Sequence, residues 1–150
     1  MANSSSARRP RFRRCADNNI PAIQVTPRDT EMMRQISTHR FLRSPQIAAL
    51  VGGSDRHVLR RLQLLYHHGY LERPRAQIDS YHRAGSQPIA YGLAGRGAAH
   101  LRRVLDLPFD RIDWTRKNGG VSRLFLDHAL MTSEIMVGFE TTAREQSGVC

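Results

Sequence analysis

This sequence is poor in cysteine and in long apolar segments. Its two cysteines, Cys15 and Cys150, lie near opposite ends of the chain without metal-ligand spacing, so neither a disulfide framework nor a zinc site is expected. No apolar run approaches the roughly 20 residues that a membrane-spanning helix needs. The N-terminus also lacks the apolar core of a signal peptide. These absences predict a cytoplasmic protein without a membrane anchor.

Lysine is almost absent too, although the chain is strongly basic. Lys117 is the sole lysine among 23 basic residues, and the formal net charge of the 150 residues is +10. The first 75 residues hold 14 arginines and 5 acidic residues, whereas the last 75 hold 9 basic and 8 acidic ones. A GC-rich genome explains arginine in place of lysine but not this uneven distribution. A one-sided positive field suits a polyanion, and the planar guanidinium grips phosphate or a guanine edge, which favours nucleic acid over an acidic membrane.

The chain divides into three parts by composition. Residues 1–22 are rich in Ser and Arg with little to bury, and they are expected to form a disordered basic arm. Residues 23–106 show helical periodicity, with Thr26 placed to cap a first helix and Ser44 a second. Residues 107–150 are expected to form a loop, which includes WTRKNGG, and then a long helix.

The stretch SDRHVLRRLQLLYHHGY, which begins at Ser54, predicts a third helix with two unlike sides. Val58, Leu62 and Leu65 form one apolar stripe, and a tight Gly-Gly turn separates this helix from the second. That is the helix-turn-helix arrangement, in which the third helix lies in the major groove. A merely solvated helix face is the alternative. The DNA contacts predicted here are Ser54, Arg56, His57, Arg60 and Arg61.

Two short strands are predicted after the third helix. The segments YLERPR and PIAYGL have strand character, and a polar loop with Gly85 joins them, which predicts a β-wing. The expected fold is therefore mainly α with a small β-wing, a winged helix-turn-helix followed by a long C-terminal helix. The further DNA contacts predicted in and around the wing are Arg73, Arg75, Tyr81, His82 and Arg83.

The C-terminal segment VSRLFLDHALMTSEIMVGFETTARE repeats apolar residues at helical spacing over five or more turns. Its apolar side is expected to pack on the domain's own core or, preferentially, on the same helix of a second subunit, because little core is left to cover. His128 is expected to be partly buried rather than a metal ligand. The residues predicted for dimerisation are Leu124, His128, Met131, Ile135 and Phe139.

Several strings carry a resemblance to known proteins. RLQLLYHHGYLER is similar to the R-L-x-x-L-x-x-x-G-y-l-x-R pattern that joins the recognition helix to the wing in many winged helix-turn-helix domains. With TPRDTEMMRQI, YGLAGRGAAHL and LDHAL, in order between residues 26 and 140, the chain resembles the replication-relaxation family of plasmid and mobile-element proteins. Ala94 stands where that family usually has a Thr or Ser cap, so the cap must come from elsewhere or be weak. The resemblance implies DNA binding linked to replication, mobilisation or their transcriptional control.

Catalysis, a metal and other cofactors are not expected in these residues. The sequence has no H-x-H motif and no G-x-x-x-x-G-K-[ST] loop, and Lys117 has Thr115 rather than an acid two places before it. His67 and His68 are adjacent and point in different directions on a helix, so a zinc set is not expected. We expect a homodimer that binds double-stranded DNA sequence-specifically, associated with the nucleoid or a plasmid. The alternatives are a winged helix that binds a protein partner and the DNA-binding part of a larger DNA-processing enzyme.

Overall fold

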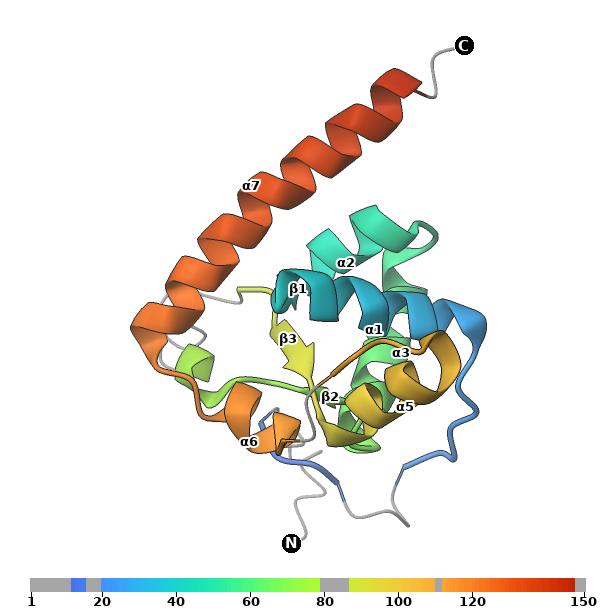
Figure 1. Cartoon of the computed structure of the whole chain (residues 1–150), viewed down its shortest axis with the longest axis vertical. Coiled ribbons are helices and arrows are strands. Elements are labelled where there is room, and N and C mark those ends of the chain that lie inside the picture. Colours follow the sequence, from blue (N-terminus) through green and yellow to red (C-terminus); the bar gives the residue numbers. More distant parts are fainter. Residues whose placement is uncertain (1–11, 16–19, 79–86, 110–111, 148–150) are drawn as a thin grey trace, which may run out of the picture.

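The structure of this chain is a computed structural model that describes residues 12–15, 20–78, 87–109 and 112–147. Its elements follow the order that the sequence predicts, with one strand, one short α-helix and one 3-10 helix in addition (Figure 1). The first half contains α1 (Pro27–His39), β1 (Phe41–Arg43), α2 (Ser44–Val51), α3 (Asp55–His67), β2 (Leu71–Glu72) and the 3-10 helix η2 (Arg75–Gln77). The second half contains β3 (Ala90–Leu93), α5 (Gly95–Leu105), α6 (Trp114–Gly119) and α7 (Arg123–Ser147).

The first two helices begin in different ways. Thr26 caps α1 as predicted: its hydroxyl accepts from the Asp29 N–H at 3.1 Å, and the Asp29 carboxylate accepts from the Thr26 N–H at 2.9 Å. The prediction that Ser44 caps α2 is wrong by one residue, because Arg43 still has the extended backbone of β1 and itself occupies the cap position. Gln46 then reaches back, and its Oε1 accepts from the Arg43 N–H at 2.8 Å.

The sheet has three antiparallel strands in the order β1-β3-β2, one more than the sequence analysis predicts. The pair of wing strands is confirmed, and its register places Leu71 opposite Leu93. The additional strand β1 pairs Leu42 with Tyr91 on the other side of β3. It was not predicted because three residues are too few for a periodic signal. Only one residue, Arg40 with a positive φ of 70°, separates β1 from the end of α1 at His39.

The two faces of the sheet bury different partners because successive side chains of a strand point to opposite sides. Leu42, Tyr91 and Leu93 face the main core, which the three N-terminal helices and α5 complete. Phe41 and Ala90 face the other way and pack against Leu126 and Leu130 of α7, and other members of this second cluster are only partly buried. Helix α7 thus covers the face of the sheet that the main core leaves open.

At the base of the wing, a side chain makes the hydrogen bonds that a longer strand would otherwise make. The Gln77 amide donates to the Ala90 carbonyl at 3.0 Å and accepts from the Ala90 N–H at 2.8 Å. It therefore satisfies both polar groups of a buried strand residue, as a neighbouring strand would. Three residues predicted to contact DNA from the wing lie outside the described residues: Tyr81, His82 and Arg83.

The segment WTRKNGG was predicted to be a loop but forms helix α6, whose N-terminus is capped by Asp113 through a 3.0 Å bond from the Arg116 N–H. This helix supplies the missing cap of α5. Ala94 has no hydroxyl to offer, and the Gly95 N–H instead donates to Thr115 Oγ1 at 3.0 Å. A helix cap that a distant residue supplies cannot be predicted from local sequence spacing. For this reason the residue that caps α5 could not be identified from the sequence.

Helix α7 is long, as predicted, and only one narrow side of it touches the domain. Leu126, Leu130 and Val137 are buried on that side, and the Ser133 hydroxyl donates to the Phe41 carbonyl at 2.7 Å. Towards its C-terminal end, which projects past the rest of the domain in Figure 1, Arg144 Nη1 donates to the Leu50 carbonyl at 2.7 Å. None of the helices in the described ranges is long and apolar enough to cross a membrane.

Candidate nucleic-acid interface

Helix α3 has an apolar side that is completely buried and an outer side that is polar. Val58, Leu62 and Leu65 have no exposed surface, whereas the side chains of Arg56 and Arg60 are exposed on the outer side. Neither of these two arginines makes a hydrogen bond or an ion pair with another described residue. Their guanidinium groups are therefore available to a phosphate or a base edge.

The N-terminus of α3 belongs to the same surface. Ser54 caps the helix as predicted, with its hydroxyl accepting from the His57 N–H at 3.5 Å, and the His57 side chain is exposed. The backbone N–H groups of a helix N-terminus favour anions. Ser54, Arg56, His57 and Arg60 thus lie together on the first turns of α3, on the side away from the core.

The Gly52-Gly53 turn sets the angle between α2 and α3. Both glycines have positive φ, 75° and 90°, which side chains other than glycine rarely adopt. The Arg28 guanidinium donates to the Gly52 carbonyl, and a Cβ on Gly53 would lie 2.1 Å from Arg28 Nη2. The turn is therefore held by α1 through Arg28, a residue that the sequence analysis did not single out.

Arg61 was predicted to contact DNA, but its guanidinium is bound inside the domain. Nε donates to Asp29 Oδ1 at 3.0 Å, and Nη2 bonds to Asp29 Oδ2 and to the Gln24 carbonyl. The Asp29 carboxylate has no exposed surface, and its hydrogen bonds raise the pKa of Arg61. Arg61 follows Val58 by three residues and precedes Leu65 by four, so it lies beside the buried stripe. We therefore assign it to helix packing and leave it out of the interface.

Arg73, also predicted as a DNA contact, is buried, with an exposed fraction of 6%. Its guanidinium carbon lies 4.2 Å from the centre of the Tyr66 ring, and Nη2 donates to the Tyr91 hydroxyl at 3.0 Å. Burial raises the pKa of Tyr91, and the neighbouring Arg73 guanidinium acts against this rise. The prediction is wrong for this residue because the strand after α3 turns it into the core. Arg75, by contrast, is exposed at the start of η2 and stays a candidate contact.

The described part of the N-terminal arm contacts the domain. Arg14 bonds to the Tyr66 and Leu71 carbonyls at 2.9 Å and pairs with Glu72 at 3.1 Å. The Cys15 N–H donates to His67 Nδ1 at 3.1 Å. Residues of the predicted arm at positions 12–15 thus have contacts with the domain, and His67 is used in one of them.

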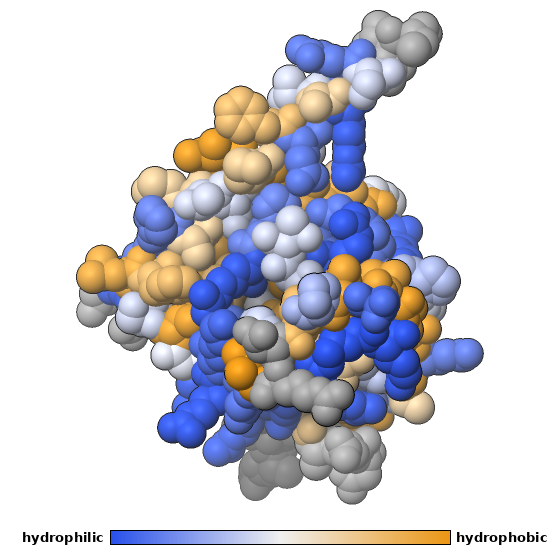
Figure 2. Space-filling view, viewed as in Figure 1, coloured by the Kyte–Doolittle hydropathy of each residue, from blue (hydrophilic) through white to orange (hydrophobic). Residues whose placement is uncertain are grey.

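An apolar stripe runs along the outer side of α7, opposite its buried side. The exposed fraction is 83% for Leu124, 63% for Met131, 56% for Ile135 and 69% for Phe139. In the space-filling view the apolar atoms follow the outer edge of α7 (Figure 2). His128 lies on the same side and is exposed in the single chain. Phe125 and Met136 are also exposed on α7, by 41% and 48%, although neither was predicted to take part in dimerisation.

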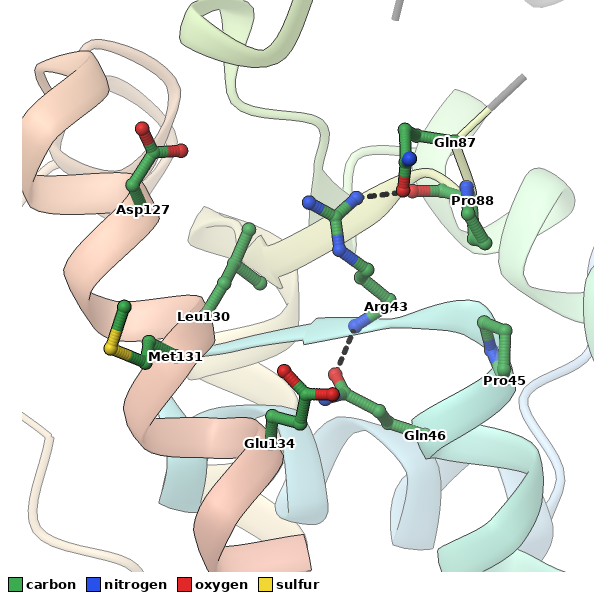
Figure 3. Close-up of a pocket in the computed structure, with 9 residues that line it drawn as sticks. All are labelled: Arg43, Pro45, Gln46, Gln87, Pro88, Asp127, Leu130, Met131 and Glu134. Carbon is green, nitrogen blue, oxygen red and sulfur yellow. Dashed lines mark hydrogen bonds between the residues drawn. The ribbon is translucent and has the colours of Figure 1, made fainter. Parts of the chain in front are cut away.

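A cleft of about 480 Å³ lies between α7 and the junction of β1 with α2 (Figure 3). The Arg43 guanidinium points across it and donates to the Pro88 carbonyl at 2.6 Å. Burial lowers the pKa of Arg43, and the carboxylates of Asp127 and Glu134 oppose this. Because two carboxylates accompany one guanidinium, the cleft has no positive excess for phosphate, and we leave it out of the interface.

The chain has three helices, a pair of wing strands after the third helix, and arginines on the outer side of that helix. These features define the class of this protein as a winged helix-turn-helix. A family model then identifies it further. The replication-relaxation model matches residues 33–149, and the chain belongs to this family, as its sequence strings indicate. No curated protein and no solved structure matches the chain significantly.

Proposed function

We propose that this protein binds double-stranded DNA through the outer side of α3. The observation that carries the proposal is the contrast between the buried stripe of that helix and Arg56 and Arg60 on its outer side, which have no partner among the described residues. The helix N-terminus at Ser54 adds backbone N–H donors, and Arg75 adds a charge near the wing. A helix that packs against two other helices on one side and carries arginines on the opposite side suits the major groove.

We further propose that the bound DNA belongs to a plasmid or mobile element, where the protein acts in replication, mobilisation or their transcriptional control. Membership of the replication-relaxation family supports a role in replication or mobilisation. The proposed interface is a binding surface: its side chains grip phosphates and base edges. We therefore assign it a binding role and no catalytic step.

The test is the salt dependence of binding to a duplex that the wild-type chain selects from a random pool. Each phosphate neutralised by arginine adds about 0.9 to the slope of log affinity against log salt. Arg56→Ala and Arg60→Ala should each lower the slope by about 1 for a phosphate contact, or cost about 1–3 kcal/mol for a base contact. Arg116→Ala removes an exposed arginine from α6 and is the matched control. A flat salt response, or equal losses in the control, would contradict the proposal and point to a protein partner.

We also propose that two copies pair through α7. Leu124, His128, Met131 and Ile135 recur at alternating steps of four and three residues, which is the spacing of a coiled-coil seam. Gly138 and Thr142 continue the same spacing, and both are exposed. The seam lies opposite the buried side, so pairing would not disturb the domain. Monomeric proteins rarely leave such a continuous apolar patch in water, and a second copy offers a complementary surface of the same kind.

A further inference from the structure

A second cavity, of about 160 Å³, lies where the C-terminal end of α1, β3 and α6 meet. Its apolar wall consists of Leu93, Phe109 and Trp114, and two cations, Arg40 and Lys117, stand at its edge. The remaining lining residues are Ser37 and Asn118, so no described carboxylate lines it. The charges therefore favour an anion, unlike those of the cleft beside Arg43.

Arg40 is held beside this cavity by an unusual backbone. Its φ of 70° is one of two positive values among the described residues other than glycine. Such positions persist where the surroundings impose them, and they cluster at ligand-binding sites. The guanidinium is half-buried, with its carbon 4.5 Å from the centre of the Phe125 ring, and burial lowers its pKa. Its carbon also lies 5.6 Å from the centre of the Phe41 ring, and its hydrogen bond to Asn118 is long, at 3.4 Å from Nε, so none of the described carboxylates already occupies the group.

The aromatic wall consists of two rings. Phe109 and Trp114 meet edge to face, with ring centres 5.6 Å apart, and Lys117 Nζ lies 4.8 Å from the centre of the Trp114 ring. The cavity is smaller than the roughly 300–1,000 Å³ of sites for drug-sized ligands. Asn118 is fixed by donating to the Leu93 carbonyl at 2.7 Å, so this wall is rigid. The exposed Lys117 side chain can turn from the ring towards an incoming anion.

We propose that this cavity binds one unpaired nucleotide, with the base against Phe109 and Trp114 and the phosphate between Arg40 and Lys117. Proteins that hold single strands combine the same two elements, aromatic side chains for the bases and cations for the backbone. The nucleotide comes either from single-stranded DNA or from the free pool, and the chemistry of recognition is the same. This site is separate from α3 and does not rest on the proposed duplex binding.

Trp114 makes the test direct, because it is the only tryptophan of the chain. Its fluorescence is followed while the full-length protein is titrated with dTMP, with an eight-residue oligothymidylate, with benzoate or with inorganic phosphate. We expect saturable quenching by the oligonucleotide, and by dTMP as well if the site takes free nucleotides. Quenching by neither would overturn the proposal. Equal affinity for benzoate would make it a general aromatic-anion site, and equal affinity for phosphate a simple anion site, and either result overturns it.

Four variants separate this site from its surroundings. Lys117→Gln removes an exposed cation, and Arg40→Gly removes the guanidinium while placing glycine at the positive φ, so both should fold. Each should weaken quenching by the oligonucleotide about tenfold, and Arg116→Gln, on the same helix but outside the cavity, should not. If Arg40→Gly does not melt cooperatively, Lys117→Gln decides alone. Arg60→Ala should leave the quenching unchanged, so a failure of duplex binding and a failure of this site are distinguishable.

Discussion

Arg60 and Arg61 are consecutive residues of α3 with opposite environments. Arg60 points into solvent, whereas Arg61 lies beside the apolar stripe and pairs with Asp29. A carboxylate without exposed surface needs such a partner, because an unpaired buried charge is strongly unfavourable. Asp29 also accepts from the Thr26 N–H, so the same side chain caps α1 and holds α3 against it.

Arg61→Ala should therefore destabilise the domain rather than only weaken DNA binding. Breaking a buried ion pair costs about 3–5 kcal/mol, and we expect the lower part of that range because Asp29 keeps its bond to the Thr26 N–H. Urea unfolding followed by circular dichroism measures the loss. Arg60→Ala is the matched control and should leave the midpoint unchanged. Equal midpoints for both variants would show that the Asp29 pair is not structural.

The burial of His100 leads us to expect that the stability of the folded domain depends on pH. It is buried, and its Nε2 lies 2.8 Å from Thr30 Oγ1. Burial, assisted by Arg103 and opposed by Asp29, lowers the pKa of His100 below its usual value of 6.5. Between the folded and unfolded pKa values the unfolded chain binds more protons, so stability rises with pH there. The contribution of neutral His100 is complete above about pH 6.5 and is lost as the pH falls below it.

We expect the melting temperature to fall between pH 7 and pH 5, and His100→Gln to flatten part of this decline because glutamine cannot take up the proton. Differential scanning calorimetry across this range makes the comparison. The difference between the two profiles is the relevant quantity. Parallel profiles for wild type and variant would contradict the assignment.

At the scale of elements, the helices are joined by contacts that span the sequence. At the N-terminus of α5, the Gly95 N–H donates to the side chain of Thr115, which belongs to α6. It also approaches the end of α3 closely, since a Cβ on Gly97 would lie 2.2 Å from the Tyr70 carbonyl oxygen. This explains two features of the string YGLAGRGAAHL: Gly97 allows the close approach, and Ala94 needs no hydroxyl because the cap comes from another helix.

Thr115→Val should weaken the start of α5, because it keeps the shape of the side chain but removes the acceptor for the Gly95 N–H. Losing a helix cap costs about 1 kcal/mol. Adding Ala94→Ser should restore part of that stability, since Ala94 already has the extended backbone of a cap residue, with φ −108° and ψ 177°. Chemical denaturation of the single and double variants measures both effects. No loss in Thr115→Val would mean that water replaces this cap at no cost.

On the scale of the whole molecule, α7 connects the domain to the proposed partner. One side carries Leu126, Leu130 and Val137 against the sheet and the main core, and the opposite side carries the exposed seam. Pairing along such a helix brings two α3 helices into one particle. A two-fold assembly of this kind reads two half-sites one helical turn apart, or a multiple of it, on DNA.

Met131→Glu and Ile135→Glu should convert the dimer to a monomer without unfolding it, because both side chains are more than half exposed. Charge in an apolar seam repels its own copy across the two-fold axis. Sedimentation equilibrium gives the mass, and the melting curve reports the fold. Leu130→Glu, one residue from Met131 but buried, is the contrasting variant and should unfold the domain. A wild-type chain that sediments as a monomer at micromolar concentration would contradict the pairing.

Much of the fold was predictable because its signals are local. The Thr26 cap, the apolar stripe of α3 and the Gly-Gly turn each occupy a few consecutive residues, and all are confirmed. The strand β1 and the helix α6 were missed because each is short and is held by distant partners, β1 by β3 and α6 by its contacts with β3 and α5. In the candidate site, Arg56 and Arg60 were placed correctly by helical periodicity. Arg73 was not, because β2 ends at Glu72 rather than continuing through the predicted strand segment, so strand alternation does not orient Arg73.

The amino-acid sequence alone determined the order of the helices, the position of the wing pair, the two-sided character of α3 and α7 and the family. These depend on spacing along the chain, and spacing is set by the fixed repeat of each element. Only the tertiary structure decided which arginines stay exposed on the outer side of α3 and which are used by the fold. That choice depends on where buried acceptors such as Asp29 and the Tyr91 hydroxyl come to lie, and these positions exist only once distant segments have packed together.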